Sequence, residues 1–364
     1  MLLKELDTPA VIVNKDIMER NLRHMAEHCR KYTIGFRPHI KTHKCLEIAR
    51  MQLDSGAIGL AVAKVGEAEI MVETGCKDIQ VAYPILGRQK LERLMPLAKK
   101  INITVSLDSM EVAEGISQKA HDYGCTLNIL IEVDVGFRRC GIPIGPGIVE
   151  FARKVSNLPN LNLKGLMIYP GHIWFGPNHK ESDWDTVKTN LKAIRKIFQD
   201  AGLPLDVVST GGTPNSRRTQ ELEGITETRI GSYPFLDMNY VDGAGYSLDD
   251  CSLMVLVTVV STAVPGMAII DGGSKTFSGD GSVLGIGGGY GYVKEDPAVK
   301  FFKMNEEHGF LDVSKALRRL QVGDRLHIIP NHVCTTINMH DQIYGYRGEI
   351  VESEWKVAAR GKVQ

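Results

Sequence analysis

The chain is predicted to fold as an α/β protein, with a (β/α)8 TIM-type barrel followed by a C-terminal, mostly-β domain. Eight short apolar or β-branched segments alternate with helical patterns between about residues 36 and 232. After about residue 248 helical patterns become rare, and Val, Ile and Thr become frequent. The length of 364 residues suffices for two domains. A doubly wound open sheet is the alternative, because periodicity does not prove that a barrel closes.

The elements are predicted in chain order. A short strand at residues 10–13 precedes a segment that Asn14 or Asp16 can cap, with apolar residues along one helical face. The predicted barrel strands are residues 36–41, 58–63, 79–83, 101–107, 127–133, 163–169, 205–210 and 227–232. The helical patterns between them include residues 66–74, 89–99, 110–123, 147–156 and 184–201. The predicted strands of the second domain are residues 253–263, 267–271, 322–329, 332–338 and 347–358.

Composition excludes several classes of protein. Lys plus Arg and Asp plus Glu both number 43, so the formal net charge is zero, and neither nucleic acid nor a membrane surface is an expected partner. Residues 1–13 lack the basic and apolar regions of a signal peptide, and residues 251–270 fit two strands and a turn better than a membrane helix. Seven cysteines without paired spacing predict reduced thiols and a cytoplasmic protein.

Residues 37–44 (Arg-Pro-His-Ile-Lys-Thr-His-Lys) are where we expect the chemistry. On a strand, Arg37, His39, Lys41 and His43 would share one face, because successive side chains alternate. Such a face is either an exposed edge or the lining of a polar pocket. In a pocket, clustered cations lower the pKa of Lys41, whose neutral amine can form a Schiff base with an aldehyde cofactor.

Polar and Gly-containing motifs recur where other barrel strands are predicted to end, at the rim where barrel active sites lie. The list of these motifs is residues 134–141, 169–172, 209–213 and 229–233. In the Thr-Gly-Gly-Thr run at 210–213, paired glycines let backbone N–H groups approach an anion closely. Together with Gly231 and Ser232 at the next strand end, this run predicts a phosphate site rather than a plain turn.

The second domain carries a candidate metal pair, His332 and Cys334. On a strand these two side chains point to the same side, as metal ligands could. The alternative is a core cysteine beside a hydrogen-bonded histidine. Thiolate with imidazole favours zinc, with manganese or magnesium as further candidates. The Gly-rich run at residues 285–291 does not open a βαβ unit, so we interpret it as a flexible loop and not as a dinucleotide site.

Several motifs, nearly from end to end, resemble one family, the D-threonine aldolase and D-serine dehydratase family of fold-type III pyridoxal-phosphate enzymes. The motifs that carry the resemblance are Arg-Pro-His-x-Lys-Thr-His-Lys at 37–44, Val-Gly-Glu-Ala-Glu at 65–69, Glu-Val-Asp-x-Gly at 132–136, Tyr-Pro-Gly-His at 169–172, Glu-Glu-His-Gly at 306–309 and Pro-Asn-His-Val-Cys at 330–334. The chain looks most similar to the low-specificity D-threonine aldolase-like branch.

The resemblance implies an alanine-racemase-like barrel over residues 14–247 and a β domain made of residues 1–13 with 248–364. It implies pyridoxal 5'-phosphate on Lys41, a divalent metal at His332 and Cys334, a small D-amino acid as substrate, and a homodimer. The other catalytic residues implied are His39 and His172. The other cofactor-binding residues implied are Arg139, Tyr169, Thr210, Gly211, Gly212, Thr213, Arg229, Gly231, Ser232 and Tyr233.

The reaction stays open between three enzymatic choices. The overall likeness favours aldol cleavage of D-threonine to glycine and an aldehyde. Cys334 favours D-serine dehydration, because dehydratases of this family carry His-x-Cys where the aldolases often carry His-x-Asp. An amino-acid racemase on the same fold needs a second acid or base opposite Lys41. A cofactor carrier without turnover is the non-enzymatic alternative, and the size of the second domain argues against it.

Overall fold

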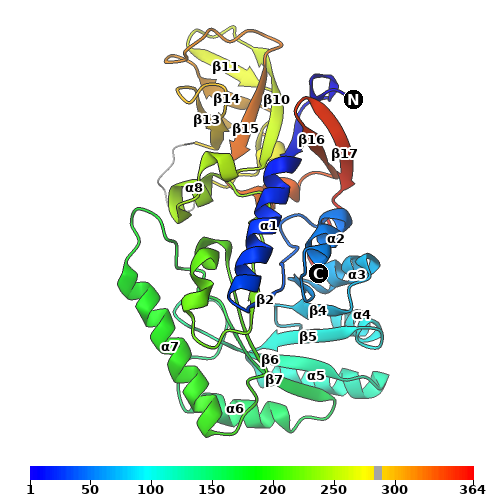
Figure 1. Cartoon of the computed structure of the whole chain (residues 1–364). Coiled ribbons are helices and arrows are strands. Elements are labelled where there is room, and N and C mark those ends of the chain that lie inside the picture. Colours follow the sequence, from blue (N-terminus) through cyan, green and yellow to red (C-terminus); the bar gives the residue numbers. More distant parts are fainter. Residues whose placement is uncertain (283–288) are drawn as a thin grey trace.

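The computed structural model describes residues 1–282 and 289–364. Its strands form one eight-stranded sheet and one nine-stranded sheet. The eight-stranded sheet and its helices occupy the lower part of Figure 1, and the nine-stranded sheet lies above them. No helix in the described part of the chain combines the length and apolar character that crossing a membrane requires.

The eight-stranded sheet is parallel and closes into a barrel, as predicted. Its strand order is β2-β9-β8-β7-β6-β5-β4-β3, and a bridge between His39 and Ala61 joins the two ends. At that seam the amide of Ala61 donates to the carbonyl of Pro38 at 2.8 Å. The open-sheet alternative is therefore wrong. The strands are β2 (Gly35–Phe36), β3 (Leu60–Val62), β4 (Asp78–Val81), β5 (Asn102–Leu107), β6 (Leu127–Val133), β7 (Leu161–Ile168), β8 (Val207–Gly211) and β9 (Glu227–Arg229).

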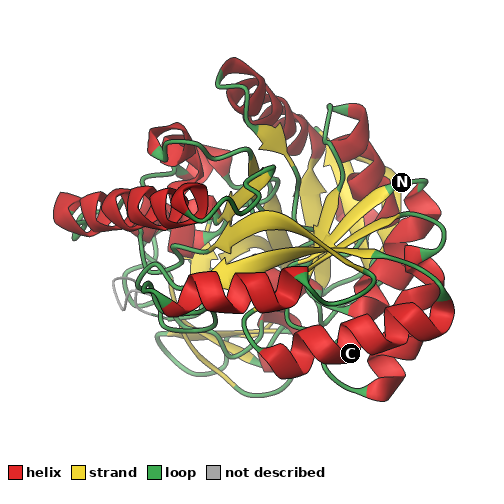
Figure 2. Ribbon diagram, turned by 90° about the horizontal axis from the view of Figure 1, so that it is seen from below, coloured by secondary structure: helices red, strands yellow, loops and turns green. Residues whose placement is uncertain are grey.

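Helices surround the barrel strands (Figure 2) and cover them with apolar faces. In the longest of these helices Trp184, Leu191 and Phe198 recur at helical spacing, and all three are buried. The first helix begins after Asn14, whose side chain accepts a hydrogen bond from the amide of Ile17. The helices are α1 (Lys15–Lys31), α2 (Leu46–Asp54), α3 (Val65–Met71), α4 (Arg88–Ala98), α5 (Met110–Tyr123), α6 (Gly147–Ser156), α7 (Glu181–Asp200) and α8 (Met238–Ala244).

The nine-stranded sheet contains a closed ring of six strands, because β10 pairs with both β15 and β11, and β14, β13 and β12 complete the circle. The strand β1, at the start of the chain, pairs antiparallel with β10 and parallel with β16. The domain boundaries drawn from the sequence stay a prediction. The strands are β1 (Ala10–Asn14), β10 (Leu253–Ser261), β11 (Met267–Ile270), β12 (Gly291–Val293), β13 (Lys300–Met304), β14 (Gly309–Asp312), β15 (Arg325–Pro330), β16 (Gln342–Arg347) and β17 (Ile350–Lys356).

Two predicted strands are wrong. Residues 332–338 are mostly the short helix α10 (Val333–Ile337), with His332 as its N-cap. The predicted strand 36–41 ends at Phe36, and the chain turns after His39, where the amides of His43 and Lys44 both donate to the carbonyl of Ile40. Within the Gly-rich run, residues 285–288 lie outside the described residues.

Candidate active site

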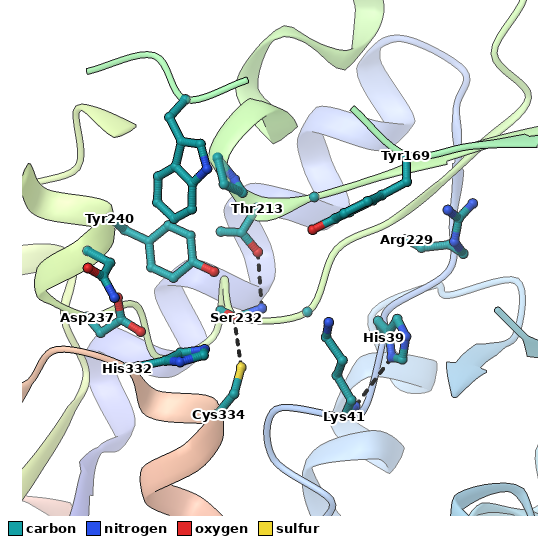
Figure 3. Close-up of a pocket in the computed structure, with 15 residues that line it drawn as sticks. His39, Lys41, Tyr169, Thr213, Arg229, Ser232, Asp237, Tyr240, His332 and Cys334 are labelled. Carbon is teal, nitrogen blue, oxygen red and sulfur yellow. Dashed lines mark hydrogen bonds between the residues drawn. The ribbon is translucent and has the colours of Figure 1, made fainter. Parts of the chain in front are cut away.

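Lys41 lies at the C-terminal mouth of the barrel, in the turn that follows the closing bridge at His39. Two cavities meet at this lysine, with volumes of about 240 and 370 Å³. His39, Lys41, Tyr169 and Arg229 line both of them. In Figure 3 the Lys41 amine points into the open space between Ser232 and His39. Of all the candidate residues, Lys41 therefore occupies the most central position.

The four basic residues predicted to share a face do not do so, because the strand ends before the turn. Arg37 instead forms ion pairs with Glu227 and Asp78, at 2.8 and 2.6 Å. Both lie at the N-terminal starts of their strands, at the opposite end of the barrel from Lys41. Of the four residues predicted to share a face, His39 and Lys41 line the two cavities.

His43 is the other residue of that face that turns away from the cavities. Its ring is buried and contacts the Gln52 side chain at 3.2 Å and the amide of Cys45 at 3.1 Å. Burial lowers the pKa of His43 to about 4. His43 is therefore a neutral imidazole whose contacts connect the turn to α2.

His39 is a neutral imidazole beside Lys41. Burial first, and the charge of Lys41 second, hold the pKa of His39 well below its usual range. Its Nδ1 atom lies 3.4 Å from the backbone amide of Lys41, so the neutral ring acts as a hydrogen-bonding group at the turn. His172 lines neither cavity of Lys41, but a neighbouring one of about 130 Å³, to which Trp174 also contributes. Burial likewise lowers the pKa of His172.

The loops after β8 and β9 form a small polar cradle. Gly212, Thr213, Gly231 and Ser232 line the 240 Å³ cavity, and Gly212 has a φ of +123°. The Thr210 hydroxyl is buried without a hydrogen-bond partner and lines neither cavity. The Thr213 hydroxyl accepts a hydrogen bond from the Ser232 amide at 3.1 Å. A Cβ on Gly211 would lie 2.5 Å from the Arg229 carbonyl oxygen, so the two strand ends approach as only glycine allows. The cradle is suited to an anion such as a phosphate.

Tyr233 was predicted to join this cradle, but its side chain points away from both cavities. Its hydroxyl accepts a hydrogen bond from the Gln52 side chain at 3.0 Å, and its ring packs against Phe36. Burial raises the pKa of this phenol. Tyr233 is thus a core residue behind the cradle, which the sequence pattern of the loop could not reveal.

Arginine and aromatic side chains gather on the other side of Lys41. The Arg139 guanidinium lies 4.4 Å from the centre of the Tyr169 ring. Arg229 is buried, donates to the Ile168 carbonyl, and has its pKa lowered to about 10 by burial. Glu132 is buried in the same cavity, where desolvation raises its pKa to about 7 against the attraction of Arg229 and Arg139.

His332 and Cys334 both reach the 240 Å³ cavity, although a helix and not a strand carries them. The Cys334 sulfur lies 3.1 Å from the Thr42 hydroxyl and 3.4 Å from the Ser232 hydroxyl. Burial opposes charge on both groups, but their mutual hydrogen bond and attraction raise the pKa of His332 and lower that of Cys334. The geometry therefore favours a thiolate, which is the form that binds metals.

Asp237 adds a carboxylate to the same wall. It is fully buried, and one of its oxygens accepts a hydrogen bond from the Val333 amide at 2.9 Å. Its other oxygen is buried without a partner, and burial raises its pKa to about 7. Throughout the described residues, no group of three or more His, Cys, Asp or Glu side chains is arranged to hold a metal ion. The metal pair thus remains a two-residue candidate.

Sequence reasoning missed several residues of this site. Asp237 and Tyr240 line the cavity from the loop after β9 and from α8, and Asp280 contacts His332 from the second domain. Each is a single polar residue in an ordinary stretch of sequence, so no neighbouring motif identifies it. Glu132 lies in the motif at 132–136, and a carboxylate at the end of an apolar strand is the feature by which the sequence could have identified it as a site residue.

Family comparison places this architecture among known proteins. The family "Alanine racemase, N-terminal domain" matches residues 13–238, and "Putative serine dehydratase domain" matches residues 252–346. A D-threonine aldolase from Arthrobacter sp is 31% identical, over 99% of this chain and 94% of its own length. A 3-hydroxy-D-aspartate aldolase from Paracoccus denitrificans (strain Pd 1222) is 32% identical, over 98% and 93%.

Solved structures of related enzymes have the same fold over nearly the whole chain. D-threonine aldolase from Filomicrobium marinum has a TM-score of 0.91 at 30% identity, covering 100% of this chain and 99% of that one. D-threo-3-hydroxyaspartate dehydratase from Delftia sp. HT23 has a TM-score of 0.88 at 28% identity, covering 98% of both chains.

A parallel barrel with a lysine at its mouth, followed by a small antiparallel barrel, defines an alanine-racemase-like protein, a class whose cofactor is pyridoxal phosphate. The chain belongs to the family of D-threonine aldolase, 3-hydroxy-D-aspartate aldolase and D-serine dehydratase. These relatives are lyases.

Proposed function

We propose that this protein is a pyridoxal-phosphate- and divalent-metal-dependent lyase that cleaves D-β-hydroxy-α-amino acids, and D-threonine in particular, to glycine and an aldehyde. One observation carries the proposal: the Lys41 amine and the His332–Cys334 pair open into the same cavity of about 240 Å³. A substrate whose amine reaches Lys41 can therefore place its β-hydroxyl near the metal pair.

The residues around Lys41 fit the cofactor. Two glycines and two hydroxyl residues from the loops after β8 and β9 line the 240 Å³ cavity, and a phosphate could lie against them. These residues are Gly212, Thr213, Gly231 and Ser232. Arg139, Tyr169 and Arg229 would surround the ring. The cofactor supplies an electron sink for the bond that breaks at the substrate α-carbon.

The metal pair also fits its group. Imidazole and thiolate suit zinc, and manganese or magnesium are further candidates. Such an ion would supply Lewis acidity toward the β-hydroxyl. Lys41 would hold the cofactor, and neutral His39 lies beside it. His172, the further catalytic residue of the proposal, lines the neighbouring cavity of about 130 Å³ in the loop after β7.

D-serine dehydration is the second candidate, and Cys334 favours it. Dehydratases that resemble this chain carry a cysteine at that position, and a serine dehydratase family covers residues 252–346. In that reaction Lys41 would remove the α-proton, and the metal pair would assist the departure of hydroxide. A racemase is the more distant alternative, and it needs a second acid or base opposite Lys41. In that case Tyr240, which lines the cavity from α8, would take this role.

Product analysis tests the proposal. Metal-loaded holoenzyme is incubated separately with D-threonine and D-serine. We expect glycine and acetaldehyde from D-threonine, and loss of turnover with a chelator that a divalent ion reverses. Pyruvate or 2-oxobutyrate with ammonia would make the dehydratase correct. Chelator-insensitive conversion of L-alanine to D-alanine would make the racemase correct.

We also propose a homodimer that works in the cytoplasm. All seven cysteines are free thiols, which suits a reducing compartment. The homodimer rests on the family resemblance. Equilibrium sedimentation tests it: a species of twice 40.2 kDa is expected, and a single 40.2 kDa species would contradict it.

A further inference from the structure

The interior of the barrel carries buried charged side chains below its catalytic mouth. Glu227 and Arg229 are the first and last residues of β9, and their side chains face the same side because they are two residues apart. Ser209 of β8 is the register partner of Glu227. All three side chains are buried. Branched apolar residues normally fill the interior of a (β/α)8 barrel, so a buried acid and base here need an explanation.

Ser209 connects these two charges. Its hydroxyl donates to a carboxylate oxygen of Glu227 at 2.6 Å and accepts a hydrogen bond from Nη1 of Arg229. A carboxylate only accepts and a guanidinium only donates, so the directions of both bonds are fixed. No carboxylate forms an ion pair with Arg229 in the part of the chain that the structure describes. Glu227 therefore reaches Arg229 through the Ser209 hydroxyl.

Glu227 is itself anchored at the base of the barrel. Its second oxygen accepts a hydrogen bond from Nε of Arg37 at 2.8 Å, and Nη1 of Arg37 donates to Asp78 at 2.6 Å. Negative and positive side chains thus alternate from Asp78 to Arg229. A carboxylate with both oxygens bonded in a buried network has a fixed position, so it can orient the groups that it contacts.

The other end of this network opens into the catalytic cavities. Arg229 lines both cavities that meet at Lys41. Figure 3 shows Arg229 on the side of Tyr169 and His39, away from Cys334. Burial lowers the pKa of Arg229 to about 10, and the attraction of Glu227 is the strongest effect that opposes this change. Glu227 therefore favours the charged form of a guanidinium at the cavity wall.

We propose that Ser209 and Glu227 are positioning residues: Ser209 links Arg229 to Glu227, so that Arg229 is held in place and in its charged form where the cofactor binds. The inference rests on the proposed function, because it takes the cavities beside Arg229 as the cofactor site. It gives the base of the barrel, through Arg37 and Glu227, a part in the site at the opposite end.

Reconstitution of the cofactor-free protein with pyridoxal phosphate, followed by absorbance, tests the role of Ser209. S209A removes the hydroxyl and should weaken cofactor affinity by about tenfold, the size expected for one hydrogen bond to a charged group. S209T keeps a hydroxyl and should restore most of the affinity. S106A is the matched control, because Ser106 is an equally buried barrel serine whose hydroxyl donates to the sulfur of Met167 at 2.9 Å and not to a charged group.

Chemical modification of arginine reports the charge of Arg229 without cofactor or turnover. Phenylglyoxal adds to the neutral guanidine, so a side chain held as a cation reacts slowly. We expect Arg229 of the cofactor-free protein to react about tenfold faster in S209A and in E227Q, because each variant loses a group that favours the charged form. Arg139, which lines the larger cavity, is the internal control and should react equally in all three proteins.

A double-mutant cycle shows whether Ser209 acts through Glu227. E227Q leaves Arg37 its pair with Asp78, so no buried arginine is left unpaired at the base. The double variant S209A/E227Q should lose no more cofactor affinity than the more affected single variant, because both changes break one link.

The outcomes separate this inference from the proposed function. Losses of affinity that add in the double variant, an equal loss in S106A, or an Arg229 reactivity that neither S209A nor E227Q changes would overturn the inference. A wild-type protein that binds no pyridoxal phosphate would instead overturn the proposed function.

Discussion

The Nδ1 atom of His332 lies 2.6 Å from a carboxylate oxygen of Asp280, and the Thr335 hydroxyl donates to the same oxygen at 2.9 Å. This contact fixes the orientation of the ring and leaves its other nitrogen for the cavity. A carboxylate behind a histidine is the arrangement that orients imidazole ligands in metal sites and makes them more basic. Asp280 is therefore a positioning residue for the proposed metal.

We predict that D280N weakens metal binding by about tenfold or more, because a neutral amide oxygen is a weaker acceptor than a carboxylate and no longer makes the His332 ring more basic. Competition between the protein and a chromophoric zinc chelator measures this directly. D249N is the matched control, because Asp249 is an exposed acid of the surface. Zinc affinity in D280N equal to that of wild type would show that the His332–Asp280 contact has no part in metal binding.

Glu132 predicts a pH dependence of stability. Its folded pKa of about 7 is raised above the ordinary glutamate value, so its contribution to stability is present at low pH and is lost as the pH rises toward 7. The neutral variant E132Q should therefore be more stable than wild type above pH 7, by up to about 3 kcal/mol.

Urea unfolding of the cofactor-free protein at pH 4 and pH 8 measures the effect of E132Q. The difference between variant and wild type should be small at pH 4, where Glu132 is protonated in the folded state and mostly protonated in the unfolded state. The same difference at both pH values would show that the carboxylate of Glu132 does not titrate as described.

The phosphate cradle predicts the effect of adding one methyl group. In G211A the new Cβ would meet the Arg229 carbonyl at 2.5 Å, so the ends of β8 and β9 must separate. Overpacking of this kind costs about 1–3 kcal/mol, and it should weaken pyridoxal-phosphate binding measured by absorbance titration. G145A is the control, because nothing lies within 4 Å of its Cβ. Equal cofactor affinity in both variants would contradict the cradle.

The barrel and much of its rim could be predicted from local pattern alone. Apolar segments with regular helical spacing between them determine the strands, and strand ends gather the glycine loops at one edge. The Thr210–Thr213 loop and Ser232 came together for this reason. His332 and Cys334 also lie on the same wall of the cavity, although the strand predicted for them is the helix α10. His332 is the residue that precedes the helix, and Cys334 lies in its first turn.

The rest of the site depends on contacts between distant parts of the chain. Arg37 left the predicted basic face because Glu227 and Asp78 neutralise it at the other end of the barrel. The turn after His39 forms because the barrel seam closes there. Asp280 meets His332 within the second domain although 52 residues separate them, and Asp237 meets the Val333 amide from the other domain, so no local signal identifies either carboxylate.

The attachment of pyridoxal phosphate to Lys41 is the central claim, and borohydride reduction of the yellow holoenzyme followed by peptide mapping tests it most directly. Reduction makes the bond between lysine and cofactor permanent. We predict one labelled peptide, carrying the label on Lys41. Lys44 is an internal control, because its amine is buried against Asn338 and Glu67 at 2.8 and 3.5 Å. A label on Lys44, or a purified protein without cofactor absorbance, would contradict the assignment.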